Sequence, residues 1–240
     1  MLPKATPEPK APVLRFSPTA WAKLLFFRDR QENEIGGFAI TAADDLLKVE
    51  DFVTVKQEVT VISVSFDDQA VAEFFESQVD AGRRPHQFCR TWLHTHPGDS
   101  PEPSTTDEAT FRRVFGRCDW AVLFVLARGG KTYARLRFNV GPGGGVLVPV
   151  EVDYRGQFGP SEHAAWEAEY KANIDAQPWS WGLDAHEPLR RSSDLAGCSV
   201  PDDWMEELEA MEPTERQTIL DELATRPDLW GEGLEASYDY

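Results

Sequence analysis

The sequence is poor in cysteine. It has only Cys89, Cys118 and Cys198, and no two of them stand in a C-x-x-C spacing. An odd number of cysteines in a chain without an export signal argues against a disulfide framework. The missing C-x-x-C spacing argues against a cysteine zinc site, including the cytidine-deaminase arrangement that pairs H-x-E with P-C-x-x-C. Cys89 follows Phe88 in an apolar run, so we expect it to be a small buried hydrophobic residue.

Long hydrophobic runs are also missing. No apolar stretch approaches the roughly 18 residues that a membrane-spanning helix needs. Residues 1–12, MLPKATPEPKAP, lack the apolar segment of a secretory signal, and their composition predicts a disordered arm. We therefore expect a soluble, cytoplasmic protein that does not contact the membrane.

Basic residues are scarce in the C-terminal part of the chain. From residue 151 onward there are 22 acidic and 6 basic residues, whereas the first 150 residues have 19 acidic and 18 basic ones. Contacts to nucleic-acid phosphates need a basic face, so this balance argues against a nucleic-acid partner. It is compatible with a basic protein partner, although an excess of acid more commonly marks a solvated surface.

One stretch carries residues suited to catalysis. His94 and His96 come at the end of an apolar run that predicts a strand over residues 87–93. Strand side chains alternate between faces, so the two imidazoles should point to the same side. After a loop rich in Pro and Gly, the segment STTDEATFRRVF predicts a helix, in whose first turn Ser104 and Asp107 share one face.

Two imidazoles and one carboxylate suit a zinc ion, which prefers tetrahedral coordination. Three protein ligands leave the fourth position free for water, which is typical of a catalytic rather than a structural site. The alternative is that Ser104-x-x-Asp107 is a capping box that satisfies an orphan backbone N–H, and that each histidine is structural. The joint occurrence of His-x-His, seven intervening residues and Ser-x-x-Asp favours the zinc site.

This pattern resembles the motif of a known family. His94-x-His96-x7-Ser104-x2-Asp107, preceded by Glu34-Ile35-Gly36-Gly37, is similar to the JAMM motif of the JAB/MPN metallopeptidases. The resemblance covers about residues 13–152 and implies a zinc-dependent peptidase or isopeptidase that acts on ubiquitin-like or other small modifier proteins. It also implies that the two histidines and the aspartate bind zinc.

Glu34 is the candidate general base. A zinc-bound water needs a carboxylate outside the ligand set to take its proton and pass it to the leaving amine. Glu32 competes for this role, because it stands only two positions away. The glycine pair favours Glu34, since the family's glutamate lies just ahead of a strand that bears glycine. Ser104 is the candidate hydroxyl donor to the negative oxygen of the tetrahedral intermediate.

The hydrophobic pattern predicts an α+β fold with a mixed β-sheet flanked by helices. The resemblance implies, more narrowly, the cytidine-deaminase-like sandwich of JAB/MPN domains in its compact, prokaryotic form. The expected helices cover residues 17–30, 67–81 and 104–115, and the expected strands cover residues 34–40, 46–55, 59–64, 87–93, 120–127, 132–140 and 146–152.

We expect three parts along the chain. The arm at residues 1–12 is followed by the metallopeptidase domain at residues 13–155 and by an acidic, mainly helical extension at residues 156–240. The extension should contain a helix over residues 162–174, a linker over residues 177–198, and helices over residues 201–211 and 214–224. The last two helices either fold back on the main domain or form a docking module for a protein partner.

Two other functions fit the same residues. Some MPN domains act only as metal-free scaffolds that bind partners, although the complete motif counts against this alternative. A zinc hydrolase that cleaves a small amide or peptide is the third alternative. A groove beside the zinc that pairs with a peptide strand would favour a protein substrate, and a closed pocket would favour a small one.

Overall fold

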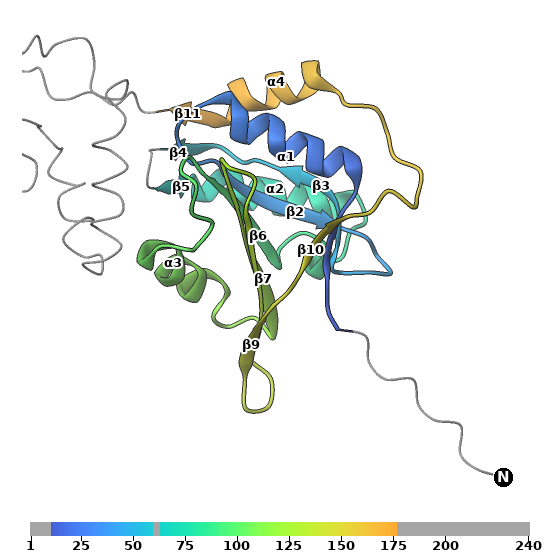
Figure 1. The fold of residues 1–240 in the computed structure, drawn as a ribbon, viewed down its shortest axis with the longest axis vertical. Helices are drawn as coiled ribbons and strands as arrows, with labels where there is room; N and C mark the ends of the chain where they lie inside the picture. Colours follow the sequence, from blue (N-terminus) through green and yellow to red (C-terminus); the bar gives the residue numbers. More distant parts are fainter. Residues whose placement is uncertain (1–10, 60–62, 177–240) are drawn as a thin grey trace, which may run out of the picture.

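The computed structural model describes residues 11–59 and 63–176 (Figure 1). Most of the predicted N-terminal arm, the linker at residues 177–198 and the helices predicted over residues 201–211 and 214–224 lie outside the described residues. Within the described ranges, no helix combines the length and the apolar character that crossing a membrane requires.

The fold is α+β with a mixed sheet, as the hydrophobic pattern predicts, and the structure shows in addition that the sheet is curled. In sheet order the eight strands are β10 (Val150–Val152), β1 (Leu14–Phe16), β3 (Lys48–Val53), β2 (Gly36–Thr41), β6 (Thr91–His96), β7 (Trp120–Ala127), β8 (Thr132–Phe138) and β9 (Gly144–Leu147). A smaller sheet contains β11 (Ile174–Ala176), β4 (Gln57–Val59) and β5 (Val64–Phe66). The helices are α1 (Pro18–Arg30), α2 (Asp68–Asp80), α3 (Thr105–Phe115) and α4 (His163–Asn173), with a short 3-10 helix, η1, at Pro85–Gln87.

The curl of the large sheet follows from the connection between β9 and β10. These strands lie at opposite ends of the sheet order, yet only Val148 and Pro149 separate them. Val148 N–H donates to the Ala134 carbonyl on β8 (2.9 Å), and the Pro149 carbonyl accepts from Leu14 N–H on β1 (2.9 Å). The two edges of the sheet must therefore approach each other, and the sheet bends toward a barrel.

Two predicted strands are wrong because each is split into two shorter strands. The strand predicted over residues 59–64 is split into β4 and β5, which pair antiparallel with Val59 opposite Val64, so the chain reverses there. The strand predicted over residues 146–152 is split into β9 and β10, which pair with different strands. The strand predicted over residues 87–93 begins later, at Thr91, and runs through both histidines.

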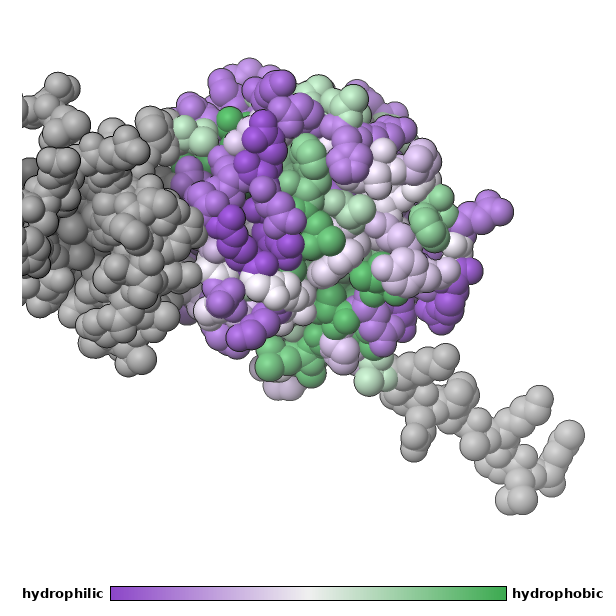
Figure 2. Space-filling model, turned by 45° about the horizontal axis from the view of Figure 1, so that its top comes forward, coloured by the Kyte–Doolittle hydropathy of each residue, from purple (hydrophilic) through white to green (hydrophobic). Residues whose placement is uncertain are grey.

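Each face of the large sheet packs its own core. Val122, Phe124 and Leu126 of β7 pack in one hydrophobic cluster with α1 and α4, whereas Ala121 and Leu123 pack in a second cluster with α2 and α3. This alternation is the period of a strand that is buried on both faces. On the described part of the surface drawn in Figure 2, hydrophilic side chains predominate, and hydrophobic ones gather in a narrow band.

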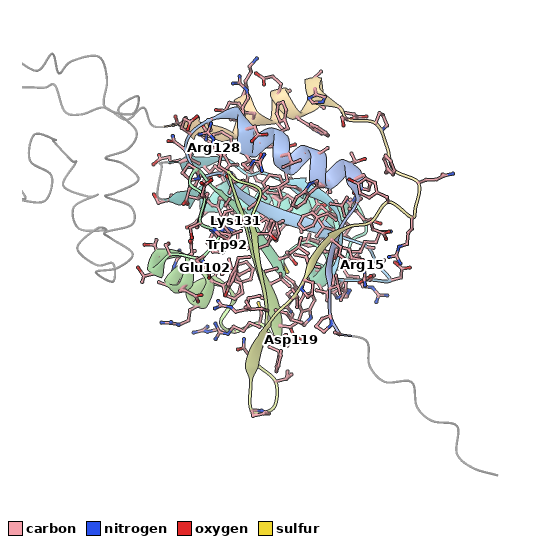
Figure 3. All side chains as sticks on the ribbon, in the orientation of Figure 1. Arg15, Trp92, Glu102, Asp119, Arg128 and Lys131 are labelled. Atoms are coloured by element: carbon pink, nitrogen blue, oxygen red, sulfur yellow. The ribbon has the colours of Figure 1, made fainter. Side chains whose placement is uncertain are left out.

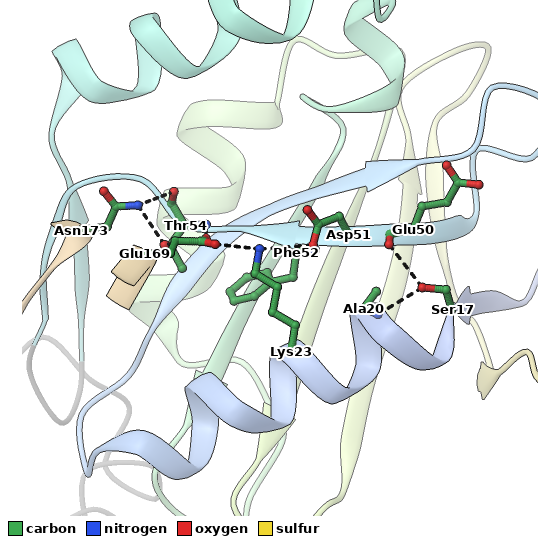
Figure 4. Close-up of polar contacts among 9 residues, drawn as sticks. All are labelled: Ser17, Ala20, Lys23, Glu50, Asp51, Phe52, Thr54, Glu169 and Asn173. Carbon is green, nitrogen blue, oxygen red and sulfur yellow. Dashed lines mark hydrogen bonds and ion pairs between the residues drawn. The ribbon is translucent and has the colours of Figure 1, made fainter. Parts of the chain in front are cut away.

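The helix predicted over residues 162–174 is confirmed as α4, which packs against α1. A polar network joins them (Figure 4): the nearly buried Lys23 ammonium pairs with Asp51 (3.2 Å) and Glu169 (2.7 Å). Glu169 also accepts from the Thr54 N–H (2.8 Å) and hydroxyl (3.0 Å), and Asn173 donates to the Thr54 carbonyl (2.9 Å). Residues 163–176 thus belong to the packed body, while the division of the chain at residue 155 stays a prediction.

Replacing Glu169 should destabilise the fold. Glu169→Ala leaves the Lys23 ammonium with one partner and the Thr54 N–H without its acceptor, so we expect the free energy of unfolding to fall by about 2 to 4 kcal/mol. Glu162→Ala is the control, because Glu162 is exposed and its side chain makes no capping hydrogen bond, and it should change stability by at most about 0.5 kcal/mol. Urea denaturation of both variants measures this difference, and equal effects would contradict the role of the network.

Candidate metal centre

Strand β6 delivers the two histidines. It lies between β2 and β7, and His94 is fully buried while His96 retains a small exposed area. Thr95 points to the opposite face, where its hydroxyl accepts from Ile35 N–H (3.0 Å) and its own N–H donates to the Ile35 carbonyl (3.0 Å). These two bonds fix the end of β6 against β2. Because side chains alternate along a strand, both imidazoles point to the face opposite Thr95.

Helix α3 delivers Asp107 through a capping box. The Ser104 hydroxyl accepts from Asp107 N–H (3.1 Å), while the Ser104 N–H (2.8 Å) and hydroxyl (2.9 Å) both donate to Asp107 Oδ2. Glu108 and Arg135 form a bidentate pair of 2.6 and 2.8 Å that ties the first turn of α3 to β8. Phe111 is buried beneath the helix. The carboxylate therefore has a fixed direction.

The cap and the histidines meet at one oxygen. The Nε2 atoms of His94 and His96 are 3.1 Å apart, and Asp107 Oδ2 lies 3.3 Å from the first and 3.4 Å from the second. Three ligand atoms in so small a triangle could hold a metal ion. Two imidazoles with one carboxylate suit a transition metal better than calcium or magnesium, which prefer oxygen ligands only.

The remaining ring nitrogens are held differently. His96 Nδ1 lies 3.0 Å from the Ser100 carbonyl. Because a carbonyl only accepts, Nδ1 must carry the hydrogen, which leaves Nε2 facing the cluster. His94 Nδ1 is buried without a hydrogen-bond partner in the part of the chain that the structure describes. Packing orients this ring instead, since the Trp92 ring lies against it with centroids 4.7 Å apart.

Charge and burial act together on the cluster. Burial lowers the pKa of His94, which keeps this imidazole neutral, although Asp107 opposes the shift. Burial alone would raise the pKa of Asp107, but His94 and His96 lower it well below its usual range. Burial would also lower the pKa of His96, but the charges of Glu34 and Asp107 and the hydrogen bonds raise it to about 9. A metal ion that binds here must displace the His96 proton, so its affinity should increase with pH.

The pairing of β2 with β6 brings Glu34 to the cluster. Gly36 lies opposite His94 in this antiparallel ladder, so Glu34 is expected opposite His96 if the register continues by two residues. Its Oε1 lies 3.6 Å from His96 Nε2, and the residue is buried with 6% of its surface exposed. Glu32 instead forms an ion pair with Arg128. The structure therefore places Glu34, and not Glu32, beside the cluster.

The site lies at the end of the sheet where β6 and β7 finish. Figure 3 labels Arg128 and Lys131, which flank the turn after β7, and Glu102 in the loop between β6 and α3. The Arg128 N–H donates to the Gly98 carbonyl (2.9 Å) and so holds the start of that loop. Sequence reasoning missed Ser100, which orients His96 from this loop, because a backbone carbonyl acceptor has no residue signature.

Comparisons with known proteins assign no family to this chain: no family model matches it, and no curated protein matches it. The assignment of a function therefore depends on the residues of the site.

Ser104 should affect both helix stability and metal binding. Ser104→Ala removes the hydroxyl that caps the helix, which costs about 1 kcal/mol of stability. It also leaves the Asp107 carboxylate with the backbone N–H of residue 104 but without the hydroxyl donor, which should weaken metal binding about 10-fold. Ser17→Ala is a matched control, because Ser17 caps α1 by accepting from Ala20 N–H (3.1 Å) and lies outside the cluster. It should cost similar stability and leave metal affinity unchanged. Zinc titration by calorimetry measures the difference, and equal affinity in both variants would contradict it.

Proposed function

We propose that this protein is a zinc-dependent metallopeptidase or isopeptidase of the JAB/MPN type. In this proposal it hydrolyses an amide or isopeptide bond, with a ubiquitin-like or other small modifier protein as the substrate. One observation carries the proposal: His94, His96 and Asp107 form a compact ligand triangle, and the buried carboxylate of Glu34 lies 3.6 Å from His96 Nε2.

The size of the triangle supports zinc. A tetrahedral site with bonds of about 2.0 to 2.1 Å places its ligand atoms about 3.3 Å apart. The three ligand atoms here are 3.1, 3.3 and 3.4 Å apart. Neighbouring ligands of an octahedral ion with similar bonds would be about 2.9 Å apart. The spacing therefore supports a tetrahedral ion with three protein ligands.

The residues divide the chemistry among them. A bound zinc ion would supply an acidic water and a positive charge for the carbonyl oxygen. Glu34 is placed to accept the proton of the attacking water and then to donate it to the leaving amine. Ser104 holds the Asp107 carboxylate, and rotation about its Cβ–Oγ bond would direct the same hydroxyl hydrogen toward the negative oxygen of the intermediate. No covalent nucleophile is needed.

The depth of the site supports an extended substrate. His94 is 0% exposed, and Glu34 and Asp107 are 6% and 7% exposed, so the reactive groups present little surface to a substrate. A flexible peptide segment with small side chains can bring a carbonyl against such groups more readily than a folded protein surface can. This favours cleavage at a chain terminus or at an isopeptide branch, as in the processing of small modifiers.

Replacing the base should separate catalysis from metal binding. Glu34→Gln keeps the size of the side chain and all three ligands, so the variant should retain zinc while kcat for hydrolysis of a fluorogenic amide at the C-terminus of a ubiquitin-like protein falls about 10²- to 10⁴-fold. His94→Ala should lose both zinc and activity. Glu32→Gln is the control and should keep both. Full activity in Glu34→Gln would refute the assignment of the base.

A further inference from the structure

Gln57 is a buried polar residue with no part in the proposed chemistry. It lies in β4, in the smaller sheet, and is only 1% exposed. Its side-chain oxygen accepts from Gly36 N–H (2.8 Å), and its side-chain nitrogen donates to the Gly36 carbonyl (2.8 Å) and to the Val55 carbonyl (2.9 Å). All three hydrogen bonds of the side-chain amide are thus made to backbone groups, and two of them are made to Gly36 of β2.

This contact replaces a missing part of the sheet ladder. β2 pairs with β3 through Phe38 and Val53, so the same register would place residue 55 opposite Gly36, but β3 ends at Val53. Without β3, the outward N–H and carbonyl of Gly36 would be buried and unpaired, which is costly. The Gln57 amide presents one donor and one acceptor in the manner of a strand and so completes the ladder at this position.

The smaller sheet also holds the segment around Gly36 in other ways. A Cβ atom at residue 36 would lie 2.8 Å from the Phe66 ring and 2.9 Å from the Val64 side chain, so β5 packs directly against this glycine. On the other side of Glu34, the Asn33 side-chain amide donates to the Val59 carbonyl (3.3 Å). Glu34 therefore lies between two tethers to β4, one at the residue before it and one two residues after it.

We infer that Gln57 is a positioning residue for the site: it fixes the Gly36 backbone, and through it the Glu34 carboxylate beside His96. The inference rests on the proposed function, since it assigns Gln57 a role in placing the general base. It predicts that loss of the amide lets the Glu34 segment move while the zinc ligands, which come from β6 and α3, stay in place.

The test replaces Gln57 in the full-length protein. Gln57→Met keeps the length of the side chain but removes its hydrogen bonds, and Gln57→Asn keeps an amide that is too short to reach. In whichever of these variants folds, kcat for the amide substrate should fall about 10- to 100-fold at full zinc occupancy, with KM changed by no more than about twofold. Gln87→Met is the matched control, because Gln87 also binds backbone, accepting from Arg84 N–H (3.0 Å) and donating to the Thr41 carbonyl (3.3 Å). It should lose stability without losing kcat.

A second measurement needs no turnover. Amide hydrogen exchange of the metal-free protein, followed by NMR, should show that the Gly36 N–H exchanges at least about 10-fold faster in the Gln57 variants and unchanged in Gln87→Met. Unchanged kcat at full zinc occupancy, or unchanged exchange at Gly36, would overturn the inference. Wild-type protein that binds zinc but cleaves no amide would instead overturn the proposed function, so the two failures can be told apart.

Discussion

The site depends on one carboxylate oxygen. Asp107 Oδ2 accepts two hydrogen bonds from Ser104 and lies within 3.4 Å of both imidazole nitrogens. Helix capping and metal binding are the two roles that the Ser-x-x-Asp pattern suggests, and here one geometry is compatible with both. Because the cap directs the carboxylate, the start of α3 must keep its position relative to the end of β6 for the triangle to exist. The Glu108–Arg135 pair and the buried Phe111 hold α3 in that position.

The smaller sheet has a comparable role on the opposite side of the site. β11 pairs with β4 so that Ile174 lies opposite Gln57, and Gln57 in turn holds Gly36, which lies opposite His94. A segment late in the chain is thus connected to the site through strand pairing and through the side-chain amide of Gln57. The polar network of Lys23 and Glu169 secures α4, which leads directly into β11.

The sequence indicates the parts of the site that depend on local geometry. His94 and His96 share a face because strands alternate, and Ser104 reaches Asp107 because residues three apart in a helix meet. Glu34 is a harder case, because its place depends on pairing between distant strands, and only the glycine pair after it gives a signal. The contacts of Gln57, and the breaks that split two predicted strands, leave no local pattern, since they arise from long-range pairing and from the closing of the sheet.

The proposed zinc site is tested most directly by the metal content of the purified full-length protein, measured by elemental analysis beside the His94→Ala/His96→Ala double variant. We expect about one zinc per chain in the wild type, because the site has three protein ligands, and none in the variant. A wild-type protein that carries no metal and takes up none on titration with zinc would contradict it. The triangle of His94, His96 and Asp107 would then be a hydrogen-bonded cluster, and the chain a scaffold that keeps only the residues of the motif.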